Sequence, residues 1–218
     1  MLIYLLLIFR LHLIVMGGLK KEMSNYQFEE TKKLLEERLS KKRYIHSLNV
    51  SEQCRILAEK NGEDIEKCVY AGLVHDICKE IPTSEMKKML VDTIFPVSRS
   101  ELASKPLWHA IAGAWYIHNE LNINDKDIIN AVRFHTVGHA GMSKVEEIVY
   151  LADLISIERD YKDVKRMRKL AYTDIEVAML EALKFSITDV VSKNGLLPHY
   201  TIEAYNQYSY ICKNKTIK

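Results

Sequence analysis

Hydrophobic positions recur with the period of an α-helix along almost the whole chain after Met23. Apolar residues three or four positions apart, with charged residues between them, are typical of a helix that buries one face. The segment from Tyr26 to Leu39 has this pattern, with Phe28 and Leu35 among glutamates and lysines. No segment keeps the alternation of a half-buried strand for more than a few residues. The pattern predicts an all-α fold, a compact bundle of roughly eight to ten helices.

Capping residues and helix breakers indicate where these helices begin and end. Asp64 is suited to cap one helix, and Ser143 with Glu146 has the spacing of a capping box at the start of another. The segment between Pro96 and Pro106 is expected to be rich in loops. The predicted helices cover residues 26–39, 44–61, 64–74, 109–121, 125–134, 145–158, 163–170, 174–192 and 201–211, with a short polar helix from residue 84.

The composition is that of a soluble globular chain. Of its 218 residues, 48% are hydrophobic and 28% are charged, which is enough to bury a sizeable core. The net charge is +2 and the pI is about 8.2, too weak a bias to indicate a nucleic-acid partner or an anionic membrane surface. None of the four cysteines has the spacing of a metal knuckle, so we expect reduced thiols and a cytoplasmic location.

Residues 1–22 differ from the rest of the chain. They are apolar, but Arg10 and His12 interrupt them, and they fall short of the ~18 clean apolar residues that a transmembrane helix needs. They also lack the basic region and the cleavage site of a signal peptide. We therefore expect that translation begins at Met23, that residues 23–218 form a single domain, and that the protein does not insert stably into a membrane. A genuine membrane anchor is the competing interpretation.

Histidines stand at the ends of several predicted helices. His46 lies near the start of one helix, His75 ends a second, His109 begins a third and His135 ends a fourth. A single histidine on a helix is usually a core or surface residue, but the helix ends of a bundle can bring side chains together at one pocket. We expect these four to act together. Three other histidines are expected to take no part: His12, His118 and His139.

Two carboxylates accompany the histidines. Asp153 lies in the apolar stretch IVYLADLIS, where a buried charge needs a metal ion, an arginine or a helix N-terminus as its partner. Asp76 follows His75 at a helix end, and a pair of polar caps is one interpretation of that position. Adjacent helical side chains point about 100° apart, so both can reach one ion only if it lies beyond the helix end. Imidazole and carboxylate together suit iron, manganese, cobalt or zinc.

The order of these residues resembles that of a known family. His46, then His75-Asp76, then Asp153 resembles the H…HD…D signature of the HD-superfamily metal-dependent phosphohydrolases. Longer segments resemble one branch, the YqeK-type symmetrical bis(5'-nucleosyl)-tetraphosphatases, over nearly all of residues 26–213. These segments are RYIHSLNV (43–50), GLVHDICKEIP (72–82), HAIAGAW (109–115), AVRFHTVGHAGMS (131–143), EIVYLADLISIERDY (147–161) and LPHYTIEAYN (197–206).

The resemblance implies a helical HD domain with a metal site and a nucleotide site. Iron is the implied metal, with manganese or another transition metal as the alternative, and the implied ligands are His46, His75, Asp76 and Asp153. The residues implied to act in catalysis are Asp76, Lys79, His109 and His135. The residues implied to face the nucleotide are Arg43, His46, Asp76, Lys79, His109, His135, Thr136, Asp153, Arg159, Leu196, Leu197, Pro198, His199, Tyr200 and Thr201.

The reaction that the resemblance implies is hydrolysis of diadenosine tetraphosphate to two ADP. A metal ion held by two histidines and two aspartates lowers the pKa of its water and gives a hydroxide that attacks phosphorus. Lys79, one helical turn after His75, and Arg159 are candidates to hold phosphate oxygens, and each also fits a solvated surface cation. His109 and His135 could donate to a phosphate, protonate the leaving ADP or bind a second metal ion.

Residue spacing and charge alone do not indicate a dinucleotide. The alternative substrates within the superfamily are a nucleoside monophosphate, a deoxynucleoside triphosphate and guanosine tetraphosphate. A different alternative is a helical binding module without the chemistry, which the presence of all four ligand residues disfavours. Residues near the C-terminus leave a homodimer open: Tyr205, Tyr208, Tyr210 and Ile211.

Overall fold

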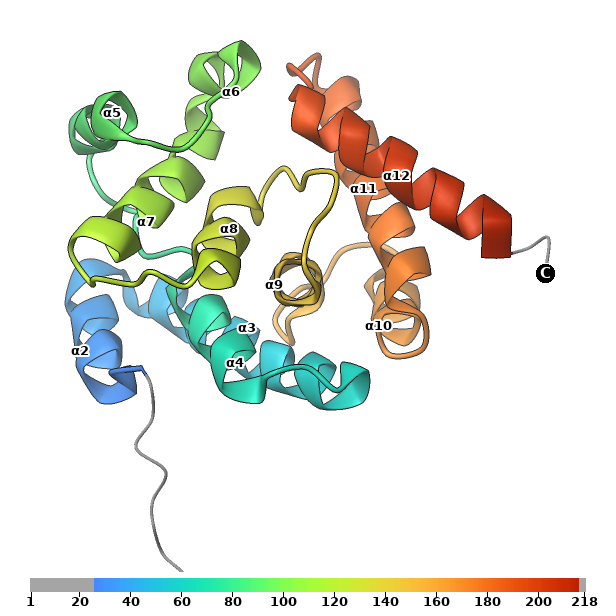
Figure 1. Ribbon diagram of the computed structural model, residues 1–218, viewed down its shortest axis with the longest axis horizontal. Helices are drawn as coiled ribbons and strands as arrows, with labels where there is room; N and C mark the ends of the chain where they lie inside the picture. Colours follow the sequence, from blue (N-terminus) through green and yellow to red (C-terminus); the bar gives the residue numbers. More distant parts are fainter. Residues whose placement is uncertain (1–25, 216–218) are drawn as a thin grey trace, which may run out of the picture.

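Residues 26–215, the part of the chain that the computed structural model describes, fold into eleven α-helices and one 3-10 turn without a strand (Figure 1). The all-α class is therefore confirmed. No helix within these residues is long and apolar enough to cross a membrane, and the expectations for residues 1–22 lie outside the described part. The helices are α2 (Phe28–Arg38), α3 (Lys41–Asn61), α4 (Ile65–Val74), α5 (Thr83–Asp92), α6 (Arg99–Ala103), η1 (Lys105–Leu107), α7 (Trp108–Asn119), α8 (Lys126–Phe134), α9 (Lys144–Ile155), α10 (Val164–Ala171), α11 (Ile175–Ser192) and α12 (His199–Lys215).

Several helices begin or end where the sequence places their caps. The Asp64 side chain accepts a hydrogen bond from the backbone N–H of Lys67 at 3.0 Å, and Ser143 with Glu146 forms the predicted capping box. Helix α3 ends at Gly62, whose φ of +67° lies in the left-handed region that glycine adopts without a steric penalty. Local sequence signals therefore determine these boundaries.

Other boundaries differ from the prediction. Helix α9 ends at Ile155 and not at Glu158, because Arg168 of α10 donates hydrogen bonds to four carbonyl oxygens between Ile155 and Arg159, at 2.7 to 3.2 Å. These bonds hold the chain in a loop after α9. Helix α12 begins at His199, two residues earlier than the apolar pattern predicts, and it continues to residue 215.

The segment between Pro96 and Pro106, expected to be loop, contains the short helix α6. Ser98 and Glu101 form a second capping box at its start. The buried Glu101 carboxylate accepts from Nη1 of Arg133 at 2.8 Å, and Nη2 of Arg133 donates to the Pro96 carbonyl at 2.6 Å. This long-range pairing with α8 stabilises a segment whose own sequence favours a loop.

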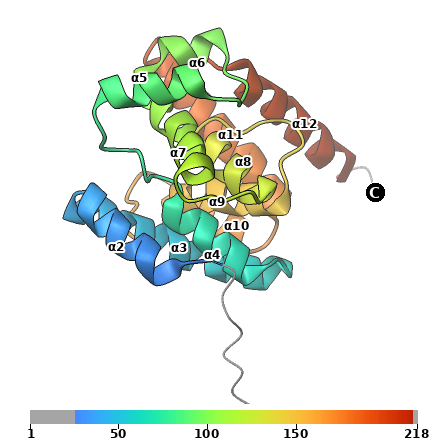
Figure 2. The same cartoon turned by 60° about the vertical axis from the view of Figure 1, so that its left-hand side comes forward.

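Helix α9 lies at the centre of the bundle, where Figure 1 views it almost end-on. Nine of its 12 residues are buried, and helices α3, α4, α8, α10 and α11 pack against it. Figure 2 shows α2, α3 and α4 as a layer on one side of the molecule, with α5 and α6 at the opposite side. The predicted metal ligands lie on α3 and α9 or directly after α4, so they are anchored in the core of the fold.

Helices α3 and α4 form a close hairpin that sets the spacing of two histidines. A Cβ added at Gly72 would lie 2.6 Å from Sγ of Cys54, which is closer than side chains pack, so glycine allows α4 to approach α3. His46 lies on α3 and His75 directly follows α4. The centroids of their rings are 5.2 Å apart in this arrangement.

The aromatic residues of α12 are not all available to a partner chain. Tyr208 is buried, and its hydroxyl donates to the Glu147 carboxylate at 2.6 Å. The expectation that Tyr208 lies on a dimer surface is therefore wrong, because its hydrogen bond with Glu147 fixes α12 to the start of α9. Tyr210 is 70% exposed.

Candidate active site

The four residues predicted as metal ligands come together where α3, α4 and α9 meet. Nε2 of His46 is 3.1 Å from Oδ1 of Asp153 and 3.8 Å from Oδ2 of Asp76. Nε2 of His75 is 3.4 Å from the same Asp76 oxygen. The ligand atoms of His46, His75 and Asp153 all lie within 4.8 Å of one another. Residues that are far apart in the sequence are thus within reach of a single ion.

Main-chain hydrogen bonds fix the orientation of three histidines at the site. The Nδ1–H groups of His75, His109 and His135 each donate to the carbonyl oxygen three residues earlier, at 2.7, 2.8 and 2.7 Å. A carbonyl only accepts, so Nδ1 carries the proton in the neutral ring and Nε2 presents a lone pair to the site. This tautomer can bind a metal ion or accept a proton.

Glu158 orients His46 in a different way, and sequence reasoning missed it. Its carboxylate pairs with Nδ1 of His46 and also accepts from Oγ of Ser156 and Nδ2 of Asn49, both at 2.8 Å. A carboxylate behind a ligating imidazole fixes the ring and raises its basicity. The pairing spans 112 positions of sequence, so no local pattern could have indicated it.

Three buried ligand atoms at the site have no hydrogen-bond partner: Nε2 of His46, Nε2 of His75 and Oδ1 of Asp76. Buried polar atoms in folded proteins almost always have one, so their convergence indicates a place for a ligand from outside the chain. Imidazole nitrogen and carboxylate oxygen suit iron, manganese, cobalt and zinc. The residues at this site therefore fit a transition metal ion.

Both aspartates are ionised at neutral pH. Burial raises the pKa of Asp76, but the positive charge of the adjacent His75 acts in the opposite direction, and the pKa stays well below its ordinary value. Burial acts on the pKa of Asp153 in the same direction, and there the positive charges of His75 and Arg159 hold it below the usual range. The site therefore offers two negative charges to a cation.

Each of these aspartates also has an arginine partner. Arg159 forms an ion pair with the Asp153 carboxylate, and its Nε donates to the Asp153 carbonyl oxygen at 2.9 Å. Nη1 of Arg43 donates to Oδ2 of Asp76 at 2.8 Å. The Asp153 side chain is 22% exposed, although its sequence neighbours suggest burial, because it projects toward His46 at the helix ends.

A second group of side chains lies against Oδ1 of Asp76. This oxygen is 3.2 Å from Nε2 of His109 and 3.5 Å from Nε2 of His135, and the two Nε2 atoms are 3.1 Å apart. Nζ of Lys79 is 3.0 Å from Nε2 of His109. Burial lowers the pKa of His109 to about 4 and also lowers the pKa of His135, so both rings are neutral at pH 7. The four predicted catalytic residues thus form one contact cluster.

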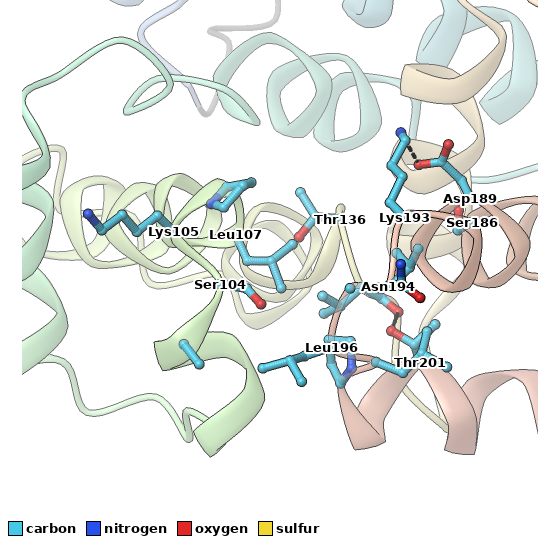
Figure 3. Close-up of a pocket in the computed structure, with 17 residues that line it drawn as sticks. Ser104, Lys105, Leu107, Thr136, Ser186, Asp189, Lys193, Asn194, Leu196 and Thr201 are labelled. Atoms are coloured by element: carbon cyan, nitrogen blue, oxygen red, sulfur yellow. Dashed lines mark hydrogen bonds and ion pairs between the residues drawn. The ribbon is translucent and has the colours of Figure 1, made fainter.

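Two cavities lie beside this cluster. The first, of about 690 Å³, lies between the 104–107 segment and the turn from α11 to α12; Figure 3 shows Lys105 and Leu107 on one side and Lys193 and Asn194 on the other. Its walls include five residues predicted to face the nucleotide: Thr136, Leu196, Leu197, Pro198 and Thr201. The second cavity, of about 550 Å³, is lined by three more: Arg43, His46 and Arg159.

Two residues predicted to face the nucleotide are placed differently. His199 and Tyr200 are not among the residues that line these two cavities. The centroids of their rings are 3.9 Å apart, and the Tyr200 ring meets the edge of Phe134. His118 and His139, expected to take no part, bind a backbone carbonyl and a glutamate outside the cluster.

Comparison with known proteins agrees with this arrangement. Residues 43–158, more than half of the chain, match the HD domain family. The chain belongs to the HD-domain family. The sequence resemblance is therefore confirmed, and it is carried by the region that holds the metal-ligand residues.

Two curated relatives of this HD-domain chain are named symmetrical bis(5'-nucleosyl)-tetraphosphatase. The Bacillus subtilis protein is 34% identical over 178 residues, which cover 82% of this chain and 95% of the relative. The Staphylococcus aureus protein is 30% identical over 184 residues, 84% of this chain and 94% of the relative. A crystal structure from Clostridium acetobutylicum, described as a predicted HD superfamily hydrolase involved in NAD metabolism, has a TM-score of 0.81 and 34% identity and covers 85% of this chain and 98% of its own. The chain is an HD-domain hydrolase.

Proposed function

We propose that this HD-domain hydrolase cleaves diadenosine tetraphosphate and related dinucleoside polyphosphates, cutting the tetraphosphate at its central phosphoanhydride to give two ADP. The observation that carries the proposal is the cluster of His46, His75, Asp76 and Asp153, in which three buried ligand atoms converge without hydrogen-bond partners. The choice of substrate is supported by relatives that align over almost their whole length and are named for this activity.

The four residues are proposed to hold iron, with manganese or another transition metal as the alternative. Such an ion, when bound, supplies the nucleophile by lowering the pKa of a water molecule to near neutrality. The chain contributes the negative charge of Asp76 and Asp153 and keeps both histidine rings in the ligating orientation. For His75 a main-chain carbonyl fixes the ring, and for His46 the Glu158 carboxylate does so.

Three cations around the cluster are proposed to receive phosphate oxygens. In the free chain, Arg43 and Arg159 neutralise Asp76 and Asp153. Once the aspartates ligate an ion, the guanidinium N–H groups are free to bind phosphate, for which their fork of donors is well suited. Lys79 lies beside His109 and reaches an adjoining oxygen.

His109 and His135 are proposed to protonate the leaving ADP. Their Nε2 atoms, 3.1 Å apart in the free site, can hold one proton between them. The negative charge of a nearby phosphate raises their pKa, so a proton is taken up with the substrate and then passed to the leaving oxygen. A second metal ion at the same place is disfavoured, because the ammonium of Lys79 already lies 3.0 Å from Nε2 of His109.

Product analysis tests the proposed function. The purified full chain is incubated with diadenosine tetraphosphate after loading with iron, with manganese or with no metal, and the nucleotides are separated by chromatography. We expect ADP as the only product, formed with metal and not without it. Formation of ATP and AMP would contradict symmetrical cleavage. Release of phosphate from nucleoside monophosphates, with diadenosine tetraphosphate left intact, would contradict the substrate class.

A cytoplasmic location is proposed as well. Three cysteines, Cys54, Cys68 and Cys78, are buried as free thiols, and such thiols are usual in a reducing compartment. Cell fractionation tests this location, and recovery of the protein with membranes would contradict it. A homodimer stays a prediction, which light scattering can test.

A further inference from the structure

We propose that the 550 Å³ cavity is a second nucleotide pocket, so that the two halves of the dinucleotide occupy separate cavities on two sides of the metal-ligand cluster. The inference rests on the proposed function and extends it to the cavity wall formed by Lys42, Asp160 and Tyr161. Neither the sequence pattern nor the family resemblance assigns a nucleotide-binding role to these three residues.

The 690 Å³ cavity adjoins one side of the cluster. Oδ1 of Asp76 faces His109 and His135, at 3.2 and 3.5 Å from their Nε2 atoms. Thr136 follows His135 in the chain, and the carbonyl oxygen of Pro106 accepts the Nδ1–H of His109. Both Thr136 and Pro106 line the 690 Å³ cavity, so one half of a substrate centred on Asp76 can lie there.

The 550 Å³ cavity adjoins the other side of the same carboxylate. Oδ2 of Asp76 accepts from Arg43 at 2.8 Å and lies 3.8 Å from Nε2 of His46. Arg43 and His46 line this cavity together with Arg159, the cation on Asp153. The two oxygens of Asp76 therefore lie against side chains that border different cavities, and a phosphate chain that crosses the cluster has space at each end.

Symmetrical cleavage requires similar binding space on both sides of the reacting bond. Attack at the central phosphoanhydride places two phosphates and one nucleoside on each side of the reacting bond. Both cavities fall within the range of about 300–1,000 Å³ that is common for ligand pockets. An enzyme that held one nucleoside and left the other in solvent would need only one of these spaces.

The wall of the 550 Å³ cavity has the chemistry that a nucleoside diphosphate requires. Lys42 adds a cation to the two arginines. The Tyr161 hydroxyl is buried without a hydrogen-bond partner, and its ring is supported by Phe185 at 4.8 Å between centroids, so the side chain can stack on a base and bond to it or to the ribose. Asp160 can accept from ribose hydroxyls.

The other carboxylates of this cavity are already engaged. Glu80 accepts from the backbone N–H and the hydroxyl of Ser40, at 2.6 and 3.0 Å. Glu158 is bonded to His46 and two further residues. The phosphates are therefore placed at the arginine end, nearest the two aspartates, and the nucleoside at the Tyr161 end.

Nucleotide binding and kinetics test the second pocket. The manganese-loaded full chain is compared with Tyr161→Ala and Lys42→Ala, by equilibrium dialysis with radiolabelled ADP and by hydrolysis of diadenosine tetraphosphate. We expect the wild-type chain to bind two ADP and Tyr161→Ala to bind one, with a KM for the dinucleotide raised about tenfold, as for loss of one stacked base. Lys42→Ala is expected to raise the KM a few-fold while kcat changes little.

Controls separate this inference from the proposed function. Lys162→Ala alters an exposed neighbour that does not line the cavity and is expected to match the wild type. Because Lys42 is exposed on α3, its replacement does not disturb the core even if Tyr161→Ala proves unstable in circular dichroism. Saturation of the wild type at one ADP, or a Lys42→Ala KM equal to that of the wild type, would overturn the second pocket. Failure of the wild type to cleave the dinucleotide would instead overturn the proposed function.

Discussion

Two buried carboxylates in this protein each pair with an arginine, and the two pairs differ in what surrounds them. In the structural pair, Glu101–Arg133, one carboxylate oxygen accepts from the guanidinium and the other from the backbone N–H and hydroxyl of Ser98. In the site pair, Asp76–Arg43, Oδ2 accepts from the guanidinium and Oδ1 has no hydrogen-bond partner. A saturated carboxylate fixes a fold, whereas one with an open oxygen can bind a ligand.

The two arginines also differ in how far their side chains are exposed to solvent. The Arg133 side chain is 1% exposed and that of Arg43 is 28% exposed. The structural pair is therefore sealed, and the site pair can be reached from a cavity. We expect changes at the structural pair to reduce stability and changes at the site pair to reduce activity.

The largest effect is expected for Asp76→Asn, which keeps the shape of the side chain and removes its charge. Loss of a ligand should lower kcat/KM for diadenosine tetraphosphate at least about 1,000-fold and reduce the bound metal. The unfolding free energy of the metal-free chain should fall, but by less than on loss of Arg133 from the structural pair, because the arginine left unpaired here is 28% exposed. Steady-state kinetics, metal analysis and urea unfolding measure the three quantities.

His118→Gln is the matched control for this change, since His118 lies outside the cluster and bonds only to a backbone carbonyl. It should leave kinetics and metal content unaltered. An Asp76→Asn protein that keeps its metal and its rate would show that the site pair has been misassigned.

Arg133→Met is expected to have the next largest effect, and on stability. It leaves the Glu101 charge buried without its cation, which should lower the free energy of unfolding by about 3–5 kcal/mol. Urea unfolding measures this loss. The metal bound per folded chain should not change. Arg166→Met removes a pair with Glu181 in which the arginine is 59% exposed, and it should reduce stability far less than Arg133→Met does. Equal losses in the two variants would remove the distinction between sealed and exposed pairs.

Glu158→Gln is expected to have a moderate effect on metal binding. The amide can still accept a hydrogen bond from His46 but no longer provides the charge behind the ring, so metal affinity should fall about 10- to 100-fold. Competition titration with manganese measures the affinity. Glu52→Gln, an exposed glutamate paired with Arg55 on the same helix as His46, serves as the control and should bind manganese as the wild type does.

The smallest effect is expected on the stability contributed by the structural pair when the pH is lowered. Burial raises the pKa of Glu101, but the hydrogen bond and charge of Arg133 outweigh it and hold the pKa below its ordinary value. The stabilisation is therefore complete above the ordinary pKa of about 4.3 and is lost as the pH falls below it. The difference in unfolding free energy between wild type and Arg133→Met should therefore shrink as the pH falls through that range. A difference independent of pH would contradict an ionised Glu101.

The metal-ligand residues could be predicted from the sequence because their types and order carry the chemistry. His46, His75 and Asp153 are separated by dozens of positions, yet each lies in a helix or directly after one, and packing of those helices brings the three residues together. The same periodicity predicts the all-α class. Asp64 and Ser143 each cap the start of a helix through hydrogen bonds to residues only a few positions away.

Other features could not be predicted because they depend on contacts between distant positions. Glu158 acts on a histidine 112 residues away, and α6 is supported by Arg133 from another helix. Tyr208 lies on the last helix, where an aromatic residue suggested a free surface, but the Glu147 carboxylate binds its hydroxyl. In each case a polar side chain finds its partner only after the helices have packed.

The four hydrogen bonds of Arg168 have a consequence for the thermal inactivation of the enzyme. One guanidinium on α10 holds the loop that carries both Glu158, behind His46, and Arg159, on Asp153. Local opening of α10 therefore releases two supports of the reaction centre at once, while the central helix stays folded. On heating, catalytic activity should be lost at a lower temperature than most of the helical structure. The highest temperature at which the protein is active is therefore determined by the local stability of α10.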